Sequence, residues 1–293
     1  MPKRINKAIE LLEQGQPVFT VGTHSGTDLT YEGGKKLAKT WADCINIGME
    51  HGAFDMTGLD NFMRGLVDGG PTNSGHRTPA VNVELPMNGM SEAEVRMNAW
   101  QIRQVLARGV HGLFLCHAES PDAIRAFVEC ARYPFQTAGV GKGINQGLRG
   151  NGGQGSAAPV WGISSDEYLD RADVWPLNPD GEIMLGLKFE NKRAASNVEA
   201  TTQVPGIGYA EWGHVDMAMS FGYKSAPRDP RPPEIQEARD RIVEACLDAG
   251  IYFQEPSTLE NITDKIDEGI LISGGNEEIA TKARKYKNRT MPV

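Results

Sequence analysis

Polar side chains that could do chemistry follow two neighbouring apolar runs of the sequence. Glu190 closes the run 182–190, and Lys188, two residues earlier, shares its side if the run forms a strand. A buried carboxylate is costly unless it is paired or bound to a metal. Asp216 stands just beyond the next run, 206–213, and two carboxylates from adjacent strands, together with waters, make an octahedral Mg²⁺ or Mn²⁺ site. We therefore expect Glu190 and Asp216 to hold a divalent metal; a Lys188–Glu190 ion pair without metal is the alternative.

Histidines gather in the same kind of place. Of the six histidines, four follow apolar runs: His24, His51, His117 and His214. His51 precedes a glycine, and an imidazole there could carry a proton at neutral pH. Gly213, directly before His214, would let backbone amides approach a substrate carboxylate closely. We expect His51 to take part in catalysis, with simple surface exposure as the alternative for each of these histidines.

Apolar or β-branched runs alternate with helix-like stretches along the whole chain. Eight runs predict strands: 17–23, 44–49, 78–85, 111–116, 182–190, 206–213, 250–254 and 269–274. After an N-terminal amphipathic helix, helical spacing recurs at 31–42, 57–68, 91–108, 121–132, 165–172, 191–200, 232–249 and 276–287. Strict alternation predicts βαβ units and a parallel sheet, and eight units close into a (β/α)8 TIM barrel with its catalytic groups at the carboxyl ends of the strands. We expect one α/β domain over residues 1–293; a doubly wound open sheet is the alternative, but its Gly-rich motif is missing after the first run.

Residues 136–164 interrupt this rhythm. The segment is rich in glycine, carries Lys142 and Arg149 as its only charged residues, and exceeds the usual length of a βα connection. We interpret it as a long βα loop, either flexible on the surface or closing as a lid over the barrel mouth.

Composition narrows the classes of partner and compartment. A formal net charge of −8 and a pI near 5.4 argue against nucleic-acid binding. No stretch approaches the ~20 consecutive apolar residues of a membrane span, and the N-terminus shows no signal-peptide pattern. The cysteines are scattered without C-x-x-C pairing, as buried free thiols of a reduced compartment would be: Cys44, Cys116, Cys130 and Cys246. We expect a cytoplasmic protein that binds neither nucleic acid nor membrane.

Four segments, taken in their order along the chain, resemble the HpcH/HpaI family of class II hydroxy-ketoacid (pyruvate) aldolases. They are GMEHGAFD (48–55), the stretch from RQVL to RYP (103–134), LKFEN (187–191) and GHVDM (213–217). The resemblance implies a (β/α)8 barrel whose last helix is often exchanged between subunits, and a homo-oligomer between dimer and hexamer. It also implies a bound divalent metal, with Mg²⁺ or Mn²⁺ foremost and Co²⁺ or Zn²⁺ as alternatives. Position by position, it implies metal ligands at Glu190 and Asp216, a base or proton relay at His51, an acidic residue near the site at Glu119, and binding of the substrate carboxylate by the amides of Gly213, His214, Val215 and Asp216.

Two positions depart from that pattern. The family's arginine on the third strand has no counterpart, because Asn82 or Val83 stands there, and its aspartate three residues before His51 is Gly48. Loss of a cation aimed at developing negative charge lowers transition-state stabilisation. Either the substrate differs or another group replaces the arginine, for which the candidates are Lys188, Arg149 and His24.

The hypothesis that we favour is a metal-dependent carbon–carbon lyase that acts on a 2-oxo acid and an aldehyde through an enolate. One alternative is a Schiff-base aldolase at Lys188. Burial could lower the pKa of this lysine enough to make its amine nucleophilic. Hydrolysis or decarboxylation of an oxo acid at the same metal site is another alternative. A non-catalytic barrel is the alternative from a different class.

Overall fold

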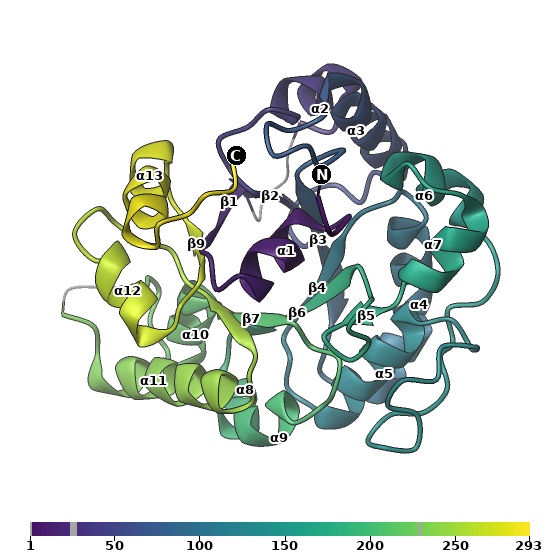
Figure 1. Cartoon of the computed structure of the whole chain (residues 1–293). Helices are drawn as coiled ribbons and strands as arrows, with labels where there is room; N and C mark the ends of the chain where they lie inside the picture. The colour runs from purple at the N-terminus through teal and green to yellow at the C-terminus, as the bar shows by residue number, and fades with distance from the viewer. Residues whose placement is uncertain (1, 24–27, 228–229) are drawn as a thin grey trace.

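Eight parallel strands form a closed barrel in the computed structural model, which describes residues 2–23, 28–227 and 230–293. His24, a candidate replacement for the missing arginine at the substrate, lies outside the described residues. The barrel strands are β1 (Val18–Thr23), β2 (Cys44–Gly48), β3 (Ala80–Asn88), β4 (Gly112–Cys116), β6 (Ile183–Phe189), β7 (Tyr209–Trp212), β8 (Tyr252–Gln254) and β9 (Ile272–Gly274). Pairing of β4 with β6 and of β1 with β9 closes the ring (Figure 1). The short β5 (Val174–Trp175) pairs only with β6. The predicted TIM barrel and all eight predicted strands are confirmed.

Helices lie around the ring, and the first of them lies across one of its openings (Figure 1). They are α1 (Lys7–Glu13), α2 (Tyr31–Leu37), α3 (Met56–Gly69), α4 (Glu92–Leu106), α5 (Pro121–Ala131), α6 (Gln154–Trp161), α7 (Ser165–Arg171), α8 (Lys192–Ser196), α9 (Val198–Thr202), α10 (His214–Ser220), α11 (Pro233–Asp248), α12 (Ile262–Glu268) and α13 (Glu277–Tyr286). Each predicted helical stretch contains a helix, and 191–200 divides into α8 and α9 at Asn197. The sequence did not predict α6, α10 or α12.

Alternation along the strands separates a helix-facing layer from the barrel interior. On β6, Leu185, Leu187 and Phe189 join the large core between strands and helices. Met184 belongs instead to a second cluster inside the barrel, with residues from the beginnings of other strands. Because successive side chains of a strand point to opposite faces, Lys188 faces the interior as Met184 does.

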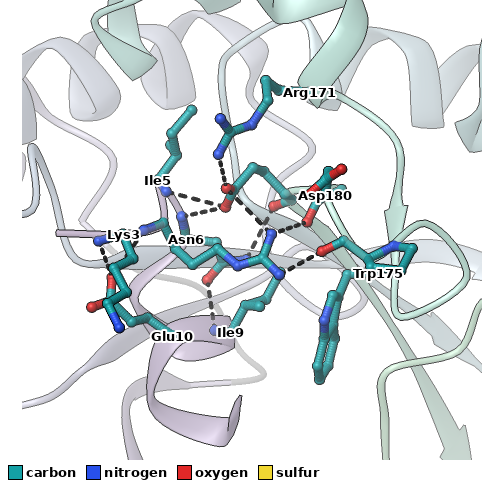
Figure 2. A network of polar contacts seen from close by, with 12 residues as sticks. Lys3, Ile5, Asn6, Ile9, Glu10, Arg171, Trp175 and Asp180 are labelled. Atoms are coloured by element: carbon teal, nitrogen blue, oxygen red, sulfur yellow. Dashed lines mark hydrogen bonds and ion pairs between the residues drawn. The ribbon is translucent and has the colours of Figure 1, made fainter. Parts of the chain in front are cut away.

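Helix α1 covers the amino-terminal opening of the barrel (Figure 1). Its apolar residues pack with that second cluster: Ala8, Ile9, Leu11 and Leu12. A buried carboxylate anchors the segment before it, because Glu182 accepts hydrogen bonds from the backbone amides of Ile5 (3.1 Å) and Asn6 (2.8 Å) and pairs with Arg171 (Figure 2). The opening opposite the expected site is therefore closed.

A second buried carboxylate, Asp43, ties this end of the barrel to the C-terminus. Asp43 accepts hydrogen bonds from Arg289 (2.7 and 2.8 Å) and Arg284 (3.2 Å), and Lys7 lies 3.2 Å from it. Burial opposes the ionisation of Asp43, but these cations hold its pKa below the usual value.

The Gly-rich segment is not a βα loop, so the expectation of a lid over the barrel mouth is wrong. It follows α5 and leads through α6 and α7 to β5. A connection from a helix to the next strand lies at the amino-terminal ends of the strands, opposite the catalytic face. Arg149 accordingly lies away from the mouth. Its amide donates to the carbonyl of Arg132 at the end of α5, and its guanidinium stacks on Tyr133 and Tyr168.

Helix α13 packs on the barrel of its own chain. Ile279, Ala280 and Ala283 form a cluster with Phe19 of β1 and with α12. An exchange of this helix between subunits stays a prediction.

The predicted state of the cysteines is confirmed, because all four are buried and free. Within the described part of the chain, no helix has both the length and the apolar character needed to cross a bilayer.

Candidate active site

Three carboxylates surround one lysine inside the carboxyl end of the barrel. The Lys188 Nζ lies 2.7 Å from Glu50 Oε2, 3.1 Å from Glu84 Oε1 and 3.3 Å from Glu190 Oε2. The carboxylates follow β2, belong to β3 and follow β6, respectively. Lys188 is 4% exposed and Glu190 is fully buried. We call this group the carboxylate cluster: Glu50, Glu84, Lys188 and Glu190.

Lys188 is the charge on which the cluster depends. Burial opposes its ammonium form, but the Glu190 and Glu84 carboxylates raise the pKa of Lys188 above its ordinary value. Burial does lower this pKa, but the carboxylates outweigh it, so the expectation of a net lowering is wrong. An ammonium is not a nucleophile, so the raised pKa of Lys188 argues against a Schiff base at this residue, which stays an alternative prediction.

One ammonium cannot neutralise three carboxylates equally. Burial opposes ionisation of Glu50, yet the close hydrogen bond from Lys188 lowers the pKa of this carboxyl. Burial raises the pKa of Glu190 in spite of Lys188 and His117 nearby. With all four groups ionised, the cluster has a formal charge of −2, which is the charge that a divalent cation would balance.

Glu190 is fixed from two sides. Its Oε1 accepts a hydrogen bond of 2.7 Å from the amide of His117, whose Nδ1 lies 3.7 Å away. On the other side, a Cβ on Gly213 would lie 2.7 Å from Glu190 Oε2. The absence of a side chain at Gly213 is thus what allows β7 to approach this carboxylate.

Glu119 stands beside this cluster, not in it. It accepts hydrogen bonds from Asn191 (2.8 Å) and Arg193 (3.0 Å), and Asn191 lies 3.3 Å from the His117 ring. Glu119 therefore orients the segment that follows Glu190. A catalytic role for Glu119 stays a prediction.

A pocket of about 310 Å³ opens above Lys188 at the carboxyl ends of β6, β7 and β8. Its lining brings together six of the predicted site residues: His51, Lys188, Gly213, His214, Val215 and Asp216. The His51 side chain is 58% exposed and its Nε2 lies 3.7 Å from Glu50 Oε2. His214, Val215 and Asp216 form the first turn of α10, which places their amides at the pocket wall. Gly213 precedes the helix, and its amide donates to the Phe189 carbonyl at 3.0 Å.

A sequence model of the HpcH/HpaI aldolase/citrate lyase family matches residues 83–269. The chain belongs to this family. The hydroxypyruvate/pyruvate aldolase of Cupriavidus necator is 29% identical over 164 residues, which are 56% of this chain and 54% of that protein. The matching region thus spans about half the length of the curated relatives.

Solved structures of the family share the fold. An HpcH/HpaI aldolase/citrate lyase family protein from Burkholderia cenocepacia J2315 gives a TM-score of 0.68 at 19% identity, with 94% of this chain and 93% of that chain covered. The citrate lyase beta subunit from M. tuberculosis, complexed with oxaloacetate and magnesium, gives 0.52 at 12% identity, with 92% and 96% covered. At these identities the likeness supports the barrel and no finer assignment.

The donor atoms of this HpcH/HpaI chain fit a divalent metal. Glu50, His117 and Glu190 each offer a ligand atom within 4.8 Å of the others. The buried Glu190 Oε2 accepts no hydrogen bond from the described residues, although Lys188 is near. Buried carboxylate oxygens without a hydrogen bond are costly unless a cation compensates them. Asp216 is outside this close group and lines the pocket next to it.

Two predicted substrate contacts do not reach the pocket. Arg149 is buried at the opposite end of the barrel, where its Nη2 donates to the Tyr168 hydroxyl at 2.7 Å. Asn82 faces the barrel interior below Glu84, at a cavity of only about 10 Å³. The structure therefore places both outside the pocket: Arg149 through the connection that follows α5, and Asn82 through its depth in the barrel, two residues before Glu84 on β3. Substrate contacts at these two residues stay predictions that the pocket does not support.

Several polar residues of the site were missed from the sequence. Glu50 and Glu84 hold Lys188, and Glu211 accepts a hydrogen bond from Gln254 in the pocket wall. For Glu84 the sequence held a signal. It stands two residues after Asn82 in a predicted strand, so the two side chains share one face of that strand.

Proposed function

We propose that this chain is a divalent-metal-dependent carbon–carbon lyase of the class II aldolase type, which acts on a small 2-oxo acid and an aldehyde. The observation that carries the proposal is the carboxylate cluster at the floor of a pocket lined by His51 and Asp216. Membership of the HpcH/HpaI family and relatives named as aldolases support it.

Glu190 and Asp216 are the proposed metal ligands. Glu50 and His117 lie close enough to Glu190 to complete the donor set. Carboxylate oxygens favour Mg²⁺ or Mn²⁺, whereas a histidine nitrogen would also suit Co²⁺ or Zn²⁺. When bound, the cation would polarise the 2-oxo group and offset the negative charge of the enolate.

The chain's own groups would bind the substrate and move its proton. The amides of His214, Val215 and Asp216 stand at the pocket wall, where they would donate to a carboxylate, whereas the Gly213 amide donates to the Phe189 carbonyl. His51 would take a proton from the carbon next to the carbonyl, or return one to it. Its exposed ring, beside Glu50, can exchange that proton with water.

Exchange of the methyl protons of pyruvate tests this proposal. NMR in D2O with Mg²⁺ or Mn²⁺ should show exchange by the wild type that EDTA abolishes. Glu190→Ala should remove the exchange, and Glu92→Ala, an exposed glutamate on α4, should retain it. Exchange that persists in Glu190→Ala would contradict the proposal.

The same samples test the Schiff-base alternative. Borohydride added with pyruvate would reduce an imine to a stable adduct on a lysine. We expect no adduct at Lys188, and an adduct in the presence of EDTA would favour the metal-independent reaction.

A further inference from the structure

Lys188 contacts two regions at once, the carboxylate cluster and the substrate pocket. Its ammonium lies within 3.3 Å of all three cluster carboxylates, yet Lys188 is also part of the pocket lining. Glu190, by contrast, is fully buried and does not line the pocket. A cation that arrives from the pocket therefore meets Lys188 before it meets Glu190.

The contacts of the Lys188 ammonium are unequal. The bond to Glu50 has good hydrogen-bond geometry at 2.7 Å, whereas Glu190 Oε2 accepts no hydrogen bond from any described residue, even with Nζ at 3.3 Å. The weaker contact is the one to the proposed metal ligand. Lys188 can leave Glu190 and still keep Glu50, which follows β2 and stands beside His51.

The pocket needs a cation of this kind. Among the described residues that line it, Lys188 is the only lysine or arginine, whereas Glu211 and Asp216 are acidic. An oxo acid brings a carboxylate, and its enolate brings more negative charge. Without a cation in the wall, those charges would face two carboxylates of the protein in a partly buried space.

We infer that Lys188 is a two-position cation: its ammonium competes with the divalent metal for the space beside Glu190, and metal binding moves it toward the pocket, where it contacts the anionic substrate. This inference rests on the proposed function, because it takes the metal and an oxo acid as the ligands. Lys188 then competes with the metal but assists the substrate. Removal of its charge must change the two affinities in opposite directions.

Calorimetry on Lys188→Gln measures both affinities without any turnover. With Mn²⁺ as the probe, we expect metal binding at least about tenfold tighter than in the wild type, because an ammonium no longer repels the ion. With saturating Mn²⁺ and oxalate as a planar, anionic probe, we expect binding about tenfold weaker. Lys192→Gln is the matched control, since Lys192 is exposed on α8 and lies over the Phe221 ring, away from the carboxylate cluster.

An unchanged or weaker Mn²⁺ affinity in Lys188→Gln would overturn the inference, and so would an unchanged oxalate affinity. If Lys192→Gln changed the Mn²⁺ and oxalate affinities equally, the effect would come from the overall charge of the protein. That result would also overturn the inference. If Lys188→Gln does not fold, reductive methylation of lysines in the wild type tests the movement of Lys188 instead. Modification of Lys188 should rise with Mn²⁺ and fall again with oxalate, and modification that Mn²⁺ leaves unchanged contradicts the movement. Failure of the lyase proposal would appear separately, as absence of pyruvate proton exchange in a wild type that binds Mn²⁺ and oxalate.

Discussion

Gly213→Ala adds a single methyl group at the tightest point of the site. The glycine has φ −78° and ψ 84°, which alanine can adopt, so the substitution causes no backbone strain. The new Cβ would lie 2.6 Å from Glu190 Cβ, 2.7 Å from Glu190 Oε2 and 3.4 Å from Lys188 Cε. Carbon atoms in contact normally stand about 3.5–4.0 Å apart, so something must move by about 1 Å.

Glu190 has little freedom to make that movement. It is fully buried, and the His117 amide holds its Oε1 at 2.7 Å. Overpacking of a buried position costs about 1–3 kcal/mol. Displacement of the proposed metal ligand should also weaken Mn²⁺ binding by about tenfold or more. A tenfold loss of affinity corresponds to about 1.4 kcal/mol of binding free energy.

Urea unfolding and Mn²⁺ calorimetry measure these two effects. Gly155→Ala is the control, because Gly155 lies in α6, nothing lies within 4 Å of its would-be Cβ, and its φ is not positive. That change should leave metal binding unaltered and stabilise the protein by up to about 1 kcal/mol, since alanine favours the helix. A Gly213→Ala protein with wild-type stability and wild-type Mn²⁺ affinity would refute the geometry described for Glu190.

Two further changes test the opposite end of the barrel. Arg149→Leu should lower the free energy of unfolding by about 2–3 kcal/mol through lost stacking on Tyr133 and Tyr168 and a lost hydrogen bond, with pyruvate exchange kinetics unchanged; a higher KM for pyruvate would contradict this placement. Asp43→Asn should cost about 3–5 kcal/mol near neutral pH, because it leaves Arg289 and Lys7 buried beside a neutral amide. The pKa of Asp43 is held below its unfolded value of about 3.9, so its contribution is complete above that pH and is lost as the pH falls toward the folded pKa. The difference in unfolding free energy between wild type and Asp43→Asn should therefore be constant between about pH 7 and 5 and shrink below about pH 4, and a difference that grows in acid would contradict the ion pairs.

The periodicity of the sequence predicts the barrel because each strand is a short, largely apolar run between turn residues or helical stretches. Helices were missed where their sequences lack that periodicity. Helix α6 has Pro159 inside it and lies in a Gly-rich segment, and α10 begins directly after β7 within the motif GHVDM. The Gly-rich segment was assigned to the wrong face, although the helix predicted at 121–132 already placed it after a helix.

At the site, the sequence indicated residues near the carboxyl ends of β6 and β7, including Lys188, but it did not indicate which carboxylates of other strands contact them. His51, Gly213 and Asp216 come together because parallel strands end at one face. The contacts of Lys188 with Glu50 and Glu84 depend on the barrel's closure, which brings side chains together across its interior. No spacing along the chain contains that information.

The position of Lys188 also explains how the third strand can lack a cation. The cavity beside Asn82 is about 10 Å³, too small for a longer side chain to replace the amide without displacing its neighbours. Two residues further along β3, Glu84 points inward and meets the Lys188 ammonium at 3.1 Å. Positive charge therefore reaches β3 from β6, which β4 separates from it. A cation on β6 that also lines the pocket can respond to what binds there, whereas a side chain at Asn82 would lie beneath the pocket.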